Sequence, residues 1–286
     1  LLNQLKGIAR FNAKDTKNAL IFTEKALLNN PEDPGLRLIA GYSSYMQEDY
    51  QTAHKHLSTI ADRLPPSHEG LRILAVSQLR LGLSVEAGDT ANLLEQVSSK
   101  DSSLISSIGL ALVQSGEINK ARELLTKNEQ AEMTNAEDLT RLGLLQLSLN
   151  DVNGIANLEM ALDQAPDEEI TKNTLATAYL TSGQTDKALL LAQRWKNSDS
   201  NDESAYMLAG LAYFNDKQYQ KAKQEFTQLL TLDNTHQRAQ LSLIEIAEQQ
   251  KQPQLVKQGV EKLLSEQPDF IPALIKLYVY DKQTGN

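Results

Sequence analysis

Small and apolar residues recur along this chain with a period of about 34 residues. The first series of small residues is Gly7, Gly41, Ala75, Gly109, Gly143, Ala176 and Gly210, and the second, about twelve residues later, is Ala19, Ala53, Ala87, Ala121, Gly154, Ala188 and Ala222. Antiparallel helices joined by a short turn approach closely only where both carry small side chains, so the period predicts an array of helix–turn–helix units. Since one such unit cannot bury its own apolar faces, neighbouring units should stack.

The period also predicts where each unit begins and ends. We place repeats at residues 1–33, 34–67, 68–101, 102–135, 136–168, 169–202, 203–236 and 237–270, with a half repeat at 271–286. This predicts a single all-α solenoid over residues 1–286, with about seven full repeats and a half repeat at each end. The sequence starts at Leu1 without a methionine and already within a helical pattern, so we expect it to be a fragment of a longer chain.

Turn residues and departures from the period add local expectations. Glycines with positive φ are predicted to close the first helix of three units, at Gly82, Gly116 and Gly183. The fifth unit is one residue short, so we expect a tighter turn around Asn150 and Asp151. In the eighth unit Ile244 and Val256 stand where small residues are expected, so its two helices should lie further apart.

The seventh repeat resembles a tetratricopeptide repeat. It matches the pattern W-x2-L-G-x2-Y…A-x3-F…P at Tyr206, Ala209, Gly210, Tyr213, Ala222, Phe226 and Asn234, where tyrosine, alanine and asparagine replace the tryptophan, leucine and proline. The terminal proline of the motif appears in other repeats, at Pro31, Pro65, Pro166 and Pro268. The resemblance covers the whole chain. It implies a right-handed superhelical solenoid of antiparallel helix pairs, with first helices lining the concave side, and a scaffold that binds other proteins.

A narrower resemblance concerns residues 71–94, 140–168 and 174–192. These stretches resemble the long tetratricopeptide lipoproteins of bacterial exosortase (PEP-CTERM) exopolysaccharide systems. That resemblance implies an exported, lipid-anchored protein that is periplasmic or associated with the outer membrane and assists polysaccharide or protein export. A cytoplasmic location stays open.

Composition and motifs narrow the function classes. The net charge is −9 without a clustered basic face, so we expect neither nucleic acid nor an anionic membrane surface as partner. No apolar run is long enough to span a membrane, and the absence of cysteine excludes disulfides and thiol chemistry. No nucleotide-binding, hydrolase or metalloprotease motif is present, so we expect no enzyme, no cofactor and no metal. His54 and His56 are interpreted as exposed helix positions, and the acidic run Asn197–Glu203 as a capping loop rather than a calcium site.

The resemblance places positions nine and twelve of each repeat on the concave side, where this chain carries a nearly unbroken apolar stripe. The candidate site is a groove for an apolar segment of a partner protein, lined by Tyr42, Tyr45, Met46, Arg72, Val76, Leu79, Arg80, Leu110, Val113, Leu144, Leu147 and Phe214. Arg72 and Arg80 would orient the partner. The alternative interpretation is that much of the stripe packs between neighbouring first helices as core. A second hypothesis is a structural spacer that self-associates end to end through apolar ends, including Leu274 and Tyr278.

Overall fold

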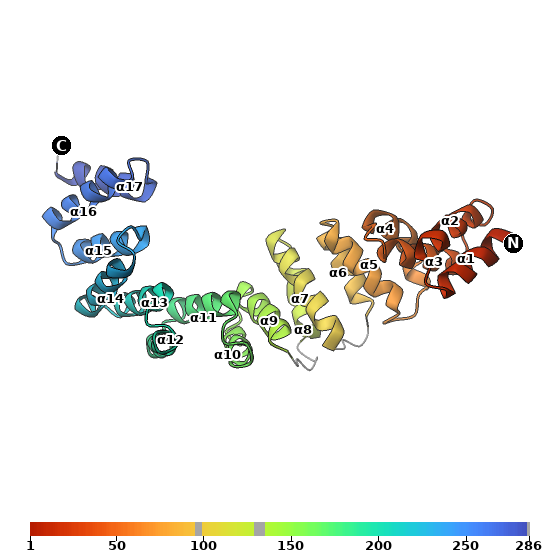
Figure 1. The fold of residues 1–286 in the computed structure, drawn as a ribbon, viewed down its shortest axis with the longest axis horizontal. Helices are drawn as coiled ribbons and strands as arrows, with labels where there is room; N and C mark the ends of the chain where they lie inside the picture. The colour runs from red at the N-terminus through yellow and green to blue at the C-terminus, as the bar shows by residue number, and fades with distance from the viewer. Residues whose placement is uncertain (95–98, 129–134, 285–286) are drawn as a thin grey trace. The chain divides into compact units, whose positions relative to one another are not determined.

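The computed structural model describes residues 1–94, 99–128 and 135–284, and in these residues the chain forms seventeen α-helices and one short 3-10 helix, with no strand. The all-α fold class is therefore confirmed. Contacts divide the chain into two compact units, Leu1–Lys172 and Asn173–Asn286, coloured red to green and green to blue in Figure 1. That residues 1–286 form a single solenoid domain stays a prediction.

Unit 1 consists of helix pairs that pack side by side. Its helices are α1 (Leu2–Asn12), α2 (Thr16–Leu27), α3 (Pro34–Tyr45), α4 (Tyr50–Ser58), η1 (Ala61–Arg63), α5 (Glu69–Arg80), α6 (Ser84–Asn92), α7 (Ser99–Gln114), α8 (Ile118–Asn128), α9 (Ala136–Ser148), α10 (Gly154–Gln164) and the start of α11 (Glu169–Thr181). Each odd-numbered helix from α1 to α9 is the first helix of a pair, and each first helix from α1 to α7 contacts the next one.

Unit 2 continues the pattern with the remainder of α11, α12 (Thr185–Ser198), α13 (Glu203–Asn215), α14 (Tyr219–Leu232), α15 (Gln237–Gln249), α16 (Pro253–Glu266) and α17 (Ile271–Thr284). Its core lies between consecutive helices, where Phe226, Leu229 and Ile246 form one buried cluster. A second cluster, around Val260 and Leu263, lies between α15, α16 and α17.

A left-handed residue follows the first helix of every pair. The three predicted glycines have φ values of 76°, 83° and 70°, which confirms their role. In the other five pairs a residue with a side chain takes the same conformation, namely Lys14, Glu48, Asn150, Lys217 and Lys251. The turn of the fifth pair is therefore not tighter at Asn150. The missing residue lies after it, because Gly154 follows Asn150 by four residues, whereas the second small residue of the other pairs in the series follows the left-handed residue by five. The helix α10 also begins later, four residues after Asn150, whereas second helices elsewhere begin two residues after the left-handed residue.

The close approach within a pair agrees with the expectation in the fifth pair and differs in others. A Cβ on Gly154 would lie 2.5 Å from the backbone oxygen of Gly143, as expected for two opposed small residues. A Cβ on Gly41 would instead overlap the side chain of Leu57, sixteen residues on. The same offset joins Gly210 to Phe226. The glycine therefore forms a recess for one large side chain of the second helix. In the eighth pair the recess moves to the second helix, where a Cβ on Gly259 would lie 2.7 Å from Cγ1 of Ile244.

Side chains in the linking loops cap the N-termini of several helices. Asp202 accepts a hydrogen bond from the backbone N–H of Ala205 at 3.1 Å and caps α13, which confirms the capping interpretation of the acidic run. Two histidines have the same role: Nδ1 of His68 accepts from the N–H of Gly70, and Nδ1 of His236 accepts from that of Ala239.

Candidate protein-binding face

The candidate site lies on the surface that α3, α5, α7 and α9 form in unit 1, which we call the first-helix face. Eleven of the twelve predicted groove residues lie on these helices or directly after one of them: Tyr42, Tyr45, Met46, Arg72, Val76, Leu79, Arg80, Leu110, Val113, Leu144 and Leu147. Most of their side chains are half-buried, while Met46 and Arg80 are exposed. Phe214 lies in unit 2, on α13, so the first-helix face is described without it.

The apolar side chains of this face pack partly against the core. Tyr42 and Tyr45 contact the buried cluster that contains Leu57 and Leu74. The rings of Phe11 and Tyr42 meet edge to face, with centroids 5.3 Å apart, and so join α1 to α3.

Further along, Leu79, Leu110 and Val113 pack against the buried cluster around Ile108 and Leu112. These side chains therefore belong to the core on one side and remain accessible on the other. The core interpretation therefore holds for part of each side chain, and the binding groove stays a prediction.

A recess opens among the first helices α3, α5 and α7. Its cavity volume is about 360 Å³, and its lining is Tyr45, Glu69, Arg72, Ile73, Val76, Asp101 and Leu104. Three predicted groove residues, Tyr45, Arg72 and Val76, thus surround one concavity. A concave surface with an apolar wall and a few fixed polar groups is the usual form of a binding site.

Arg72 is held by two acidic neighbours, and its predicted role in orienting a partner stays a prediction. Its Nε and Nη2 donate to the two carboxylate oxygens of Asp101, and its Nη1 lies 3.1 Å from Oε2 of Glu69. The hydrogen bond to Asp101 is the main reason that the pKa of Arg72 is raised. Because Asp101 is only 1% exposed, the pair fixes the first turn of α7 against α5. Arg80 is exposed at the end of α5.

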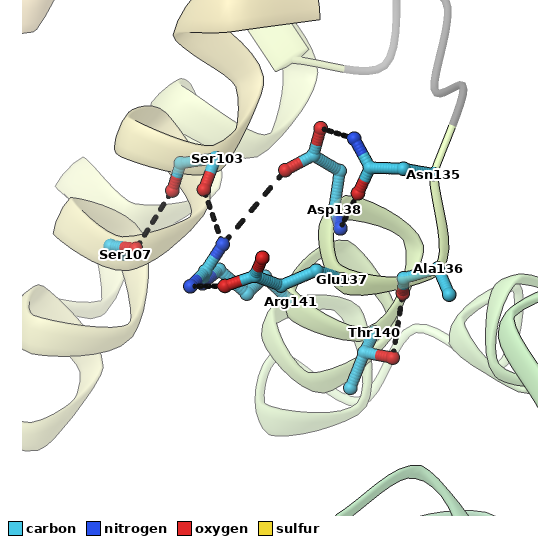
Figure 2. A network of polar contacts seen from close by, with 8 residues as sticks. All are labelled: Ser103, Ser107, Asn135, Ala136, Glu137, Asp138, Thr140 and Arg141. Carbon is cyan, nitrogen blue, oxygen red and sulfur yellow. Dashed lines mark hydrogen bonds and ion pairs between the residues drawn. The ribbon is translucent and has the colours of Figure 1, made fainter. Parts of the chain in front are cut away.

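A second arginine holds α7 from the other side (Figure 2). Arg141 on α9 donates from Nη1 to Oγ of Ser103 and from Nη2 to a carboxylate oxygen of Glu137. Asp138 lies 3.9 Å from its Nη1, and Asn135 caps the helix by accepting from the N–H of Asp138. Arg141 was not among the predicted site residues, although its spacing of four residues from Glu137 is typical of an ion pair on a helix.

Neither of the two histidines expected to be exposed on α4 is an exposed residue. His56 is buried, at 3% exposure, although we expected an exposed position. It lies on α4 and faces α2, and His54, two residues earlier, is half-buried on a different side of the helix. Among the described residues, no group of three histidine, aspartate or glutamate side chains is arranged to hold a metal. None of the described helices combines the length and apolarity that crossing a bilayer requires.

Comparison with known proteins gives the fold. The tetratricopeptide repeat family matches residues 203–236. The C-terminal part of a tetratricopeptide repeat-containing protein from Cytophaga hutchinsonii is similar at 18% identity and a TM-score of 0.50, over 68% of this chain and 78% of that one. MamA from Desulfovibrio magneticus is similar at 19% identity and a TM-score of 0.47, over 59% of this chain and 97% of that one. No curated protein matches the sequence. At these identities the likeness shows the fold alone. Residues 203–236 are therefore a tetratricopeptide repeat, and the chain has the all-helical fold of tetratricopeptide-repeat solenoids.

Proposed function

We propose that this protein is a non-catalytic scaffold that binds an apolar segment of a partner protein along the first-helix face of unit 1. The observation that carries the proposal is the recess beside Tyr45 and Val76, on a face where α5, α7 and α9 also carry half-buried apolar side chains. The tetratricopeptide fold is consistent with such a scaffold.

The ion pairs of Arg72 and Arg141 support this site by fixing its geometry. Each arginine joins α7 to a neighbouring first helix, so the apolar side chains between them are presented on a rigid surface. Because both guanidinium groups are already paired, apolar contacts would contribute most of the affinity. An amphipathic helix or an extended segment with aliphatic and aromatic side chains would fit these requirements.

Exposed methionines provide the test of this site. Met46, at the end of α3, is 54% exposed, and Met160, on the second helix α10, is 52% exposed, so the two side chains are matched in type and exposure. A photo-crosslinking amino acid at position 46 should capture a partner from cell-envelope extract that the same amino acid at position 160 does not capture. The variant Met46→Glu/Val76→Lys should lose the partner, while Met160→Glu should retain it.

Equal capture from the two positions, or retention of the partner by a folded Met46→Glu/Val76→Lys variant, would refute the first-helix face. Leu79 and Leu110 are less suitable targets, because both pack against the core and a charge there would also reduce stability.

For the cellular setting, we propose the periplasm or the outer membrane and a role in exopolysaccharide or protein export. This rests on the resemblance of residues 71–94, 140–168 and 174–192 to exosortase-associated lipoproteins. Fractionation of cells that make the natural full-length protein tests it. Recovery in the envelope fraction would agree, and recovery in the cytosol would refute it.

A second candidate function is self-association through α17. Ile271, Ile275 and Tyr278 on this helix are each more than half exposed, as an unpaired solenoid helix would be. If α17 mediates association, light scattering should show a mass that rises with concentration, and Leu274→Glu should abolish the rise. A monomer at all concentrations would exclude this function.

A further inference from the structure

A second concavity of unit 1 lies away from the first-helix face, between the second helices α2 and α4. Its cavity volume is about 480 Å³, within the range of small-molecule sites. Its lining comes from three helices and the loop after α2: Ile21, Glu24, Lys25, Leu27, Leu28, Pro31, Arg37, Lys55 and His56.

The imidazole of His56 is an unsatisfied polar group in this lining. It is 3% exposed, and neither ring nitrogen has a hydrogen-bond partner among the described residues. Its Nε2 lies 3.6 Å from Oε1 of Glu24, which is too long for a hydrogen bond. Burial, and then the charge of Lys55, lowers the pKa of His56, so the ring is neutral at pH 7 and holds one donor and one acceptor. A buried group of this kind usually has a partner.

The charges around the cavity favour a monoanion. Lys25, Lys55 and Arg37 are cationic, and Glu24 is the one carboxylate in the lining. Arg37 is held in place by Pro31 O at 2.7 Å and Thr59 Oγ1 at 3.2 Å, and a carboxylate oxygen of Glu32 lies 3.8 Å from its Nη2.

Glu32 is shared with a second arginine, because its other carboxylate oxygen lies 3.7 Å from Nη2 of Arg63. Arg37 is already held by Pro31, Thr59 and Glu32, so Lys25 and Lys55 are the cations of the lining that remain for a ligand. These two lysines exceed Glu24 by one positive charge. A metal ion is disfavoured by the same cations, and a dianion would leave a negative charge unmatched.

The remaining wall is apolar and partly open. Leu28, at the end of α2, is 84% exposed, and Ile21, on the same helix, is 41% exposed. Pro31 continues this wall in the loop. An exposed leucine beside a cationic cavity fits a ligand that has both an aliphatic chain and an acidic group.

We propose that this cavity binds a free aliphatic monocarboxylate. The alkyl chain lies along Ile21, Leu28 and Pro31, and the carboxylate lies between Lys25 and Lys55. There it accepts a hydrogen bond from the ring of His56. The site is separate from the partner-binding face, so either can exist without the other.

Calorimetry with four simple probes tests the ligand class. Sodium octanoate should bind in a saturable manner, at least about 10-fold more tightly than acetate, which lacks the chain, or octan-1-ol, which lacks the charge. Octylammonium should not bind. Absence of saturable octanoate binding, or equal binding of octan-1-ol or octylammonium, would overturn the proposal.

Charge-matched variants test the location. Lys25→Gln/Lys55→Gln should weaken octanoate binding about 10-fold, and Lys6→Gln/Lys17→Gln, the same change of net charge on α1 and α2 outside the lining, should leave it unchanged. Leu28→Ser removes an exposed side chain and should weaken octanoate while leaving acetate unaffected. Equal effects of the two lysine pairs would indicate general charge attraction and refute the site.

Nuclear magnetic resonance of the imidazole rings supplies an independent measurement. The chain has four histidines, so ring labelling gives four signals. Octanoate should shift the signal of His56 and raise its pKa, because a carboxylate favours the protonated ring. The signals of His68 and His236, which cap helices elsewhere, should stay unchanged. A His56 signal that does not respond to saturating octanoate would refute the proposed contact.

Discussion

The recess that Gly210 provides for Phe226 leads to a quantitative prediction for Gly210→Ala. A Cβ at this position would overlap Cε1 of Phe226 and would lie 2.7 Å from both Cδ1 and Cζ of the ring. Phe226 has no exposed surface and packs within the core of unit 2. The ring therefore has no open space into which it could rotate, so α13 and α14 must move apart.

Two opposing effects set the magnitude. Overpacking a core typically destabilises by about 1–3 kcal/mol, and alanine is favoured over glycine within a helix by about 1 kcal/mol. Because three ring atoms are affected at once, we expect the upper part of the overpacking range. The net loss in the free energy of unfolding should be about 1–2 kcal/mol.

Urea unfolding, followed by far-UV circular dichroism and by tryptophan fluorescence, measures this loss in the free energy of unfolding. The fluorescence reports on unit 2, because Trp195, the one tryptophan of the chain, lies on α12. Phe226→Leu should relieve the clash, so the double variant should show a favourable coupling of at least about 1 kcal/mol. Gly35→Ala is the control, because Gly35 is exposed on α3 and a Cβ there meets only Oδ1 of Asp33. A Gly210→Ala protein as stable as wild type, or a double variant without coupling, would refute the recess.

Three further predictions concern buried charge, pH and capping. Arg72→Met removes the guanidinium that pairs with the buried carboxylate of Asp101, and it should lower the free energy of unfolding of unit 1 by about 2 kcal/mol. This is less than the usual 3–5 kcal/mol, because Arg72 is partly exposed. In urea unfolding, Arg72→Met/Asp101→Asn should recover part of the lost stability, and no recovery would contradict the pairing. The pKa of folded His56 lies below its ordinary value of 6.5, so below that pH the unfolded chain binds a proton that the folded chain resists. Stability present at pH 7 should therefore decrease as the pH falls towards 5, and thermal melts of His56→Gln should show a smaller decrease; an equal decrease would assign it to other groups. Asp202→Ala removes the cap on Ala205 and should cost about 1 kcal/mol, whereas Asp202→Asn should cost little, and a similar loss in both would refute the cap.

Local turn chemistry was only partly legible in the sequence. Gly82, Gly116 and Gly183 were recognised because glycine is the usual residue at positive φ. Lys14, Glu48 and Lys217 adopt the same conformation without such a signal. The positive φ at these three positions follows from how the two helices of each pair pack. In the sequence, only the 34-residue period indicates where such a residue lies.

The candidate site shows a similar limit. The stripe of apolar residues was predicted from its repeat positions, but the partners of Arg72 were not, because Asp101 is 29 residues away and approaches only when α5 and α7 pack. His56 was misread for the same reason. It lies next to the polar residues His54 and Lys55 on α4, and the side chain of Glu24 from the preceding pair lies 3.6 Å away. The twelve groove residues as a binding site stay a prediction.

The sequence by itself determined the all-helical architecture, the length of the repeat and the apolar stripe, because period and composition report which positions must be small, apolar or in a turn. Only the tertiary structure decided that Gly210 accommodates Phe226, that arginines hold α7 on both sides, and that a buried histidine lies in a cavity lined by cations. These features depend on side chains from different helices. Their distances are set by how the helix pairs stack, which a periodic pattern does not specify.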